Sequence, residues 1–123
     1  MTTEDIRRWA IAHPEVAESS HFLFHSPVFK VRGRSFLGLG RGEKMAVFLI
    51  SQEDTDEEAA GDPSHCRSVR RQDATRSLLG LEVEFAHVSS KRIERLVEQA
   101  WRQQAPKRLV AARDRGESAG SLR

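Results

Sequence analysis

The chain has 123 residues, of which 38% are hydrophobic and 31% charged, and its formal net charge is +2. This length supports one domain with a single core. The longest apolar run, residues 45–50, is far shorter than the roughly 20 residues of a membrane-spanning helix. The sequence therefore excludes a membrane span, and so small a net charge does not by itself indicate a nucleic-acid partner.

The charges are distributed unevenly along the chain. Residues 1–63 carry a net charge of −4, whereas residues 64–123 carry +6. Such asymmetry is compatible with an anionic partner on one side, and equally with two solvated faces and a basic tail. The single cysteine, Cys66, cannot form an internal disulfide, and the N-terminus lacks the features of a signal peptide. We therefore expect a cytoplasmic protein.

The N-terminal residues predict a helix that Thr2 or Thr3 caps. It ends at His13, because Pro14 disfavours helical geometry in the residue before it. The apolar face of this helix is expected to comprise Ile6, Trp9, Ala10 and His13.

Three short strands are predicted after a connecting loop over residues 14–27. Residues 28–32 alternate between apolar and polar side chains, and Gly33 is expected to turn the chain into a second strand over residues 35–39. Residues 45–50 form a third strand. It is apolar on both faces, so it should be central in the sheet or partly covered by a partner.

The second half of the chain continues the alternation of helix and strand. An acidic helix is expected over residues 52–60, an edge strand near residues 66–70, a half-buried strand over residues 81–85 and a final helix from Ser89 or Ser90 to about Ala105. Short consecutive strands joined by tight turns pair antiparallel. The sequence thus predicts a two-layer α+β fold, an antiparallel sheet with helices on one face.

One domain should span residues 1–109, and residues 110–123 should form a flexible basic tail, since they lack a core-forming pattern. Pro106 stops the last helix, which would place Lys107 and Arg108 at its unpaired carbonyls. The expected core comprises Phe29, Val31, Phe36, Val47, Leu49, Val83, Ile93, Leu96 and Val97, with Trp9 and Trp101 packed nearby.

Four segments together resemble a known family. They are RRWAIAHPEVAES at residues 7–19, PVFKVRGRSFLGL at residues 27–39, LEVEF at residues 81–85 and AWRQQAPKRL at residues 100–109. In this order they resemble the MmcQ/YjbR family of small bacterial proteins. The resemblance covers residues 3–110 and implies a fold like that of secretion chaperones, with the element order α-β(3)-α-β(2)-α.

Members of that family are commonly labelled DNA-binding, and the resemblance implies the same for this chain. Two positions depart from the family pattern. Leu49 stands where relatives usually carry a lysine. Relatives often have a Gly-Trp pair before the last strand, whereas this chain has Leu79, Gly80 and Leu81 there. A ligand contact that relatives make through either position would be altered here.

The histidines and the cysteine do not form a recognisable metal site. His21 and His25 lie 40 residues from His65 and Cys66, and no spacing typical of zinc ligands links the two pairs. We therefore expect no metal and no other cofactor.

Cys66 could act as a nucleophile if a histidine lay beside it, and Arg67 and Arg70 would lower its pKa if they were close. No sequence element indicates an oxyanion hole or an orienting carboxylate. We therefore predict a protein that is not an enzyme.

Basic side chains gather around the first hairpin, in the polar segment before the last strand and after the last helix. Such side chains can neutralise phosphates without reading bases, in a salt-sensitive way. The candidate nucleic-acid-binding residues are Lys30, Arg32, Arg34, Arg67, Arg70, Arg71, Lys107 and Arg108.

Two functions remain open for a non-enzymatic binding module. One is weak, nonspecific DNA binding through the basic hairpin. The other is a protein-interaction or dimerising role for the sheet or its apolar third strand, with no nucleic-acid role. One continuous positive face would favour the first, and scattered arginines paired with acidic side chains would favour the second.

Overall fold

A computed structural model describes residues 2–20, 26–40, 44–70 and 78–116 and shows an α+β fold. The strands form a six-stranded antiparallel sheet in the order β1-β2-β3-β4-β6-β5. The strands are β1 (Val16–Ser20), β2 (Pro27–Val31), β3 (Arg34–Leu39), β4 (Met45–Phe48), β5 (Cys66–Arg70) and β6 (Leu78–Glu84). The α-helices are α1 (Thr3–Ile11), α2 (Gln52–Gly61), α3 (Ser90–Gln104) and α4 (Lys107–Asp114), and a 3₁₀ turn spans Phe85–His87.

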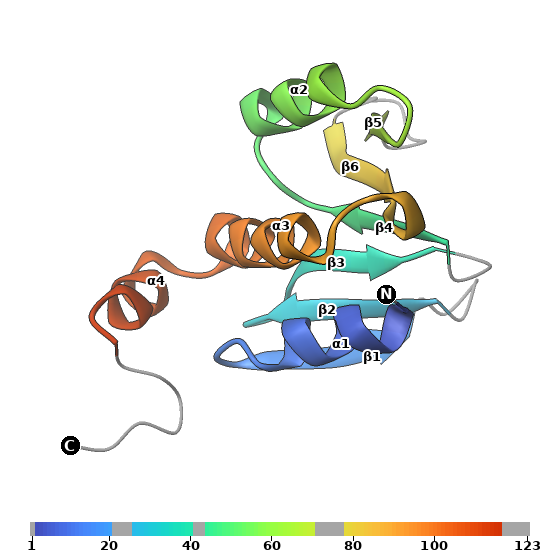
Figure 1. Cartoon of the computed structure of the whole chain (residues 1–123). Helices are drawn as coiled ribbons and strands as arrows, with labels where there is room; N and C mark the ends of the chain where they lie inside the picture. Colours follow the sequence, from blue (N-terminus) through green and yellow to red (C-terminus); the bar gives the residue numbers. More distant parts are fainter. Residues whose placement is uncertain (1, 21–25, 41–43, 71–77, 117–123) are drawn as a thin grey trace.

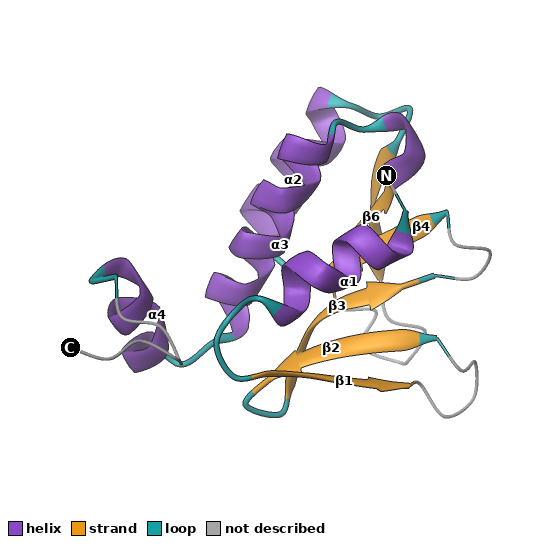
Figure 2. Cartoon of the chain, turned by 60° about the horizontal axis from the view of Figure 1, so that its bottom comes forward, coloured by secondary structure: helices purple, strands orange, loops and turns teal. Residues whose placement is uncertain are grey.

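Helices α1, α2 and α3 lie on one side of the sheet, as both views show (Figures 1 and 2). Helix α3 packs on β3 and β4, with α1 on one flank and α2 near the β6-β5 edge. This arrangement follows from the apolar stripe of α3, whose five members are all buried. They are Ile93, Leu96, Val97, Ala100 and Trp101. The predicted two-layer fold with helices on one face is confirmed.

Polar side chains fix where the helices begin. Thr2 caps α1, and Asp5 returns a hydrogen bond to the Thr2 backbone, which completes a capping box. Ser51 and Ser89 cap α2 and α3 by accepting hydrogen bonds from backbone amides one turn ahead. Within the described ranges, no helix combines the length and the apolar character that crossing a membrane requires.

In the central strand β4, the side chains that face the core are not the ones that the sequence predicts. Its pairing with β6 sets Phe48 beside Leu81, so Phe48 faces the helices and is fully buried. Val47 and Leu49 therefore point to the helix-free face and are only half-buried. Their assignment to the core was wrong, because both faces of the strand are apolar and periodicity alone could not set its phase.

Residues 14–27 are not simply a loop, because β1 lies within them. It pairs with β2 along its whole length, from Val16 opposite Val31 to Ser20 opposite Pro27. This strand lies at the edge of the sheet and buries almost none of its side chains. Val16 is half-buried and the other four residues are exposed. The strand therefore has no hydrophobic alternation by which it could be recognised in the sequence.

The chain also remains helical beyond the point where a tail was predicted. Pro106 stops α3 and then serves as the N-cap of α4, because its fixed φ suits a helix start. Leu109 and Val110 pack partly against the core. The tail prediction was therefore wrong for residues 110–114, and residues 117–123 lie outside the described part. Helix α4 sits beyond the end of α3, set off from the sheet (Figures 1 and 2).

Candidate functional site

A two-residue hairpin turn positions the first basic residues. Arg32 and Gly33 both have positive φ, 51° and 84°, as a type I′ turn requires. Arg34 opens β3 directly after the turn and is exposed. Arg32 Nη1 donates to Glu15 Oε1 at 3.1 Å, and Glu15 also has a positive φ of 57°. The turn therefore leaves Arg34 at the margin of the helix-covered face, while Arg32 is held by a carboxylate.

Lys107 and Arg108 lie at the beginning of α4 rather than at the end of α3. Both are exposed in its first turn, which contains no acidic residue and no side-chain cap. The expectation that they neutralise the last carbonyls of the preceding helix was wrong, because a new helix starts there. Cations at the positive end of a helix are unfavourable, so an anion near this turn would be stabilised.

Arg34 and Lys107 line the same hollow, which has a volume of about 560 Å³. Neither makes an ion pair within the described part of the chain. One wall contains Arg102 and Asp114, whose side chains are paired at 2.5 Å. The remaining lining residues are Gln103, Ala105, Pro106, Val110 and Ala111. The lining of the hollow thus combines small apolar residues with Arg34 and Lys107, two cations that make no ion pair among the described residues.

We define the basic end of the molecule as Arg32, Arg34, Lys107 and Arg108. A second hollow, of about 430 Å³, adjoins it and shares Arg34. Leu49 and Leu79, which depart from the pattern of the resembled family, line this second hollow. Gln104 Nε2 donates to the Leu49 carbonyl there at 3.1 Å, which fixes the end of α3 against β4.

The other candidate residues do not join the basic end. Lys30 is half-buried on β2. Arg67 and Arg70 lie on β5, separated from β3 by two strands, which corresponds to about 14 Å across the sheet. Arg67 Nε donates to Glu82 Oε1 at 2.6 Å. Arg71 lies outside the described residues. The eight predicted residues therefore do not form one continuous positive face, and the pairing of Arg32 and Arg67 with carboxylates favours the protein-interaction alternative. Arg34 and Lys107, which line one hollow, are the part of the set that still favours phosphate binding.

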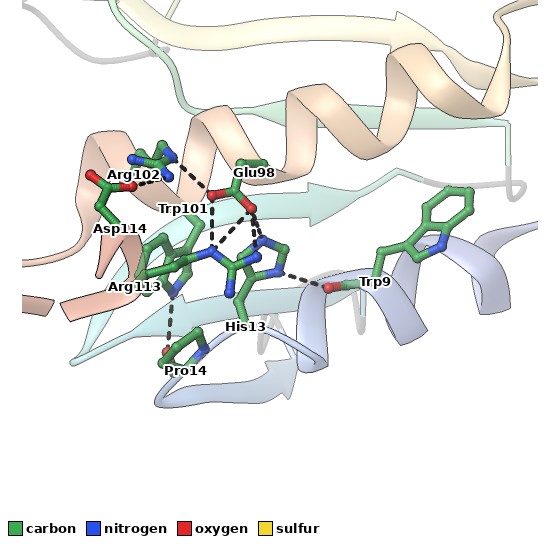
Figure 3. Close-up of polar contacts among 8 residues, drawn as sticks. All are labelled: Trp9, His13, Pro14, Glu98, Trp101, Arg102, Arg113 and Asp114. Carbon is green, nitrogen blue, oxygen red and sulfur yellow. Dashed lines mark hydrogen bonds and ion pairs between the residues drawn. The ribbon is translucent and has the colours of Figure 1, made fainter. Parts of the chain in front are cut away.

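Sequence reasoning missed a polar cluster centred on Glu98 of α3 (Figure 3). Arg113 of α4 donates to both carboxylate oxygens, at 2.8 to 3.2 Å. Arg102 donates to Oε2 at 2.8 Å, and His13 Nε2 lies 2.7 Å from Oε1. The Glu98–Arg102 spacing of four residues was a visible signal, but the contact with His13 joins positions 85 residues apart.

The geometry of this cluster keeps Glu98 ionised. Partial burial alone would raise the pKa of Glu98, but hydrogen bonds from Arg113 and His13 lower it to about 2. His13 Nδ1 lies 2.8 Å from the Trp9 carbonyl oxygen, which can only accept a hydrogen bond. Both ring nitrogens of His13 thus face oxygen atoms, which fixes the orientation of the ring beside the Glu98 carboxylate.

Cys66 lies in surroundings that do not activate a thiol. Its side chain is buried, and desolvation raises its pKa although Arg92 Nη2 lies 3.6 Å from Sγ. Arg92 is committed to Glu58 at 2.6 Å and to Asp62 at 3.0 Å. The lowered pKa that Arg67 and Arg70 would cause if they were close is not found, because desolvation raises the pKa of the thiol.

The histidines near Cys66 do not complete a metal site. His65 stacks on His87 with ring centroids 5.2 Å apart, and His65 Nδ1 contacts Asp62. Across the described ranges, no three His, Cys, Asp or Glu side chains are grouped so as to hold a metal ion. His21 and His25 lie outside these ranges.

The fold has a solved counterpart. The crystal structure of the Deinococcus radiodurans protein DR2400, described as carrying a DUF419 domain, matches with a TM-score of 0.69. The match covers 99% of this chain and 96% of that one at 15% sequence identity. No protein-family model and no curated protein matches the chain. At this identity the comparison establishes the fold alone.

Proposed function

We propose that this chain is a non-enzymatic binding module of the MmcQ/YjbR type. It contacts the phosphate backbone of DNA through the basic end, weakly and without sequence preference. The observation that carries the proposal is the hollow between Arg34 and Lys107. Two cations from different elements converge there without carboxylate partners in the described structure, so they are available to an external anion.

The chemistry of the hollow favours phosphate contacts over base readout. Lysine and arginine bind phosphate through charge and hydrogen bonds that carry no sequence information. Among the described residues that line the hollow, none is an aromatic side chain on which a base could stack. Binding of this kind has dissociation constants of roughly 10⁻⁴ to 10⁻⁶ M at physiological salt.

The test is titration of a labelled duplex by fluorescence anisotropy at several salt concentrations. We expect the double variant Arg34→Glu, Lys107→Glu to bind at least about tenfold more weakly at low salt. The slope of log K against log salt should become shallower by about 0.9 for each phosphate that the variant no longer neutralises.

The matched control is the double variant Lys44→Glu, Lys91→Glu, which changes the net charge equally. Both lysines are exposed and lie away from the basic end, Lys44 before β4 and Lys91 in the first turn of α3. This control should bind like the wild type. Equal reductions in affinity in the two double variants, or no binding by the wild type at low salt, would contradict the proposal.

A second candidate function is self-association through the helix-free face of the sheet. Val47 and Leu49 favour it, because these apolar side chains are only half-buried there. Sedimentation analysis of the wild type and of Val47→Glu would test this function. A dimer that the substitution dissociates would support it, and a monomeric wild type at high protein concentration would exclude it.

A further inference from the structure

Helix α4 supplies much of the hollow but is not itself part of the core. Lys107, Val110, Ala111 and Asp114 all line the hollow, and none of the residues of α4 is fully buried. The placement of Lys107 in the hollow that Arg34 also lines therefore depends on what holds α4 against the rest of the molecule.

Two ionic contacts near the end of α4 provide that attachment. Arg113 makes its paired hydrogen bonds to Glu98, and its guanidinium carbon lies 5.6 Å from the centre of the Trp101 ring. Asp114 accepts a hydrogen bond from Arg102, which is itself bound to Glu98. Figure 3 shows these side chains converging from α3, α4 and the segment after α1.

In the described part of this cluster, Glu98 is the only carboxylate that contacts His13, Arg102 and Arg113 together. Without the charge of Glu98, the guanidinium groups of Arg102 and Arg113 would lose the carboxylate that they share, and Asp114 would remain as the carboxylate bound to Arg102. Two-point contact between a carboxylate and a guanidinium also fixes orientation, which a single exposed ion pair does not. Removing the charge of Glu98 should therefore release α4 rather than merely weaken one ion pair.

We propose that Glu98 is a positioning residue of the binding hollow. Through Arg113 it holds α4 in the orientation that places Lys107 in the hollow that Arg34 also lines. The identity of the ligand that the hollow binds rests on the proposed function, whereas the docking of α4 does not. Anion binding and docking of α4 are then coupled, and each stabilises the other.

The test measures docking directly, by hydrogen exchange of the α4 amides in the full-length chain without ligand. In Glu98→Gln we expect the amides of α4 to exchange at least about tenfold faster, while those of β3 and β4 stay protected. Glu98→Asp keeps the charge and should restore part of the protection. Glu94→Gln is the matched control, since Glu94 is exposed one turn earlier on α3, and it should exchange like the wild type.

Affinity for the labelled duplex completes the test. Glu98→Gln should weaken binding at least about fivefold although it removes a negative charge, which by itself would strengthen phosphate binding. Unchanged protection of α4 in Glu98→Gln would overturn the inference, as would loosened α4 with unchanged affinity. Failure of the wild type to bind duplex overturns the proposed function instead, and the exchange data then decide the inference alone.

Discussion

Glu98 makes the stability of this protein depend on pH in a predictable direction. Its pKa is lowered to about 2, below the ordinary value of 4.5, because Arg113 and His13 outweigh the effect of partial burial. A lowered pKa contributes stability that is fully present above the ordinary value and is lost as the pH falls towards 2. We expect the unfolding free energy of the wild type to fall more between pH 5 and pH 2.5 than that of Glu98→Gln. Urea titrations at several pH values measure this, and parallel profiles would contradict it.

Thr55 carries a buried hydroxyl whose cost can be measured. The residue is fully buried in α2, and its Oγ1 has no hydrogen-bond partner among the described residues. Burying an unpaired hydroxyl is unfavourable, whereas a methyl group of similar size carries no such penalty. Thr55→Val should therefore be neutral or stabilising by up to about 1 kcal/mol. A destabilisation above about 1 kcal/mol in denaturant would show that the hydroxyl is paired.

The thiol of Cys66 should become reactive only when the protein unfolds. Burial raises the pKa of its thiol, and its side chain is only 3% exposed. Alkylation requires an accessible thiolate, so the folded chain should react with iodoacetamide at least about a hundredfold more slowly than the chain in denaturant. Comparable rates in the two conditions would show a reactive cysteine and would count against the proposed non-enzymatic function.

At the scale of elements, helices and strands that bury an apolar face were the easiest to predict from the sequence. Helix α3 has five buried residues on one stripe, and its bounds matched expectation closely. Strand β5 buries only Cys66 and was still found where expected, at Cys66–Arg70, but from its place in the polar segment and not from periodicity. Strand β1 and helix α4 were missed, because their backbones are ordered by pairing and ion pairs while their side chains stay largely exposed. Sequence periodicity detects buried faces, so elements that bury little escape it.

Strand β6 depends on a glycine for its close approach to β4. A Cβ at Gly80 would lie 2.5 Å from the Phe48 carbonyl oxygen and 3.0 Å from its carbon. Both atoms belong to the backbone of a central strand, so the sheet itself would have to shift. Gly80→Ala should cost about 2 kcal/mol or more. Gly38→Ala on β3 is the control, since its Cβ would meet nothing within 4 Å, and denaturant titrations should show little destabilisation there. Equal destabilisation by the two substitutions would refute the packing argument.

At the scale of the whole molecule, the candidate basic residues could be identified from the sequence, but which of them lie close together in the fold could not be predicted. Arg34 and Lys107 line the same hollow because the end of α3 and the start of α4 lie near the hairpin between β2 and β3 (Figure 1). Arg67 is separated from them because β5 lies at the far edge of the sheet, beyond β6. Strand order and the placement of α4 depend on contacts between distant positions, such as Arg113 with Glu98. Local patterns contain no information about such contacts, so the residue types were predictable and their grouping was not.

The whole molecule should keep its fold without α4. Every fully buried hydrophobic residue of the described core lies at or before Ala105, and α4 adds only partly buried contacts and the ion pairs of Arg113 and Asp114. We expect a chain ending at Leu109 to unfold cooperatively in denaturant, with an unfolding free energy lower by about 1–3 kcal/mol. Its Trp101 emission should shift to the red, because Arg113 no longer covers the ring. A chain ending at Gly116 is the control and should match the full-length protein. Disappearance of the cooperative transition in the shorter chain would instead make α4 an integral part of the core.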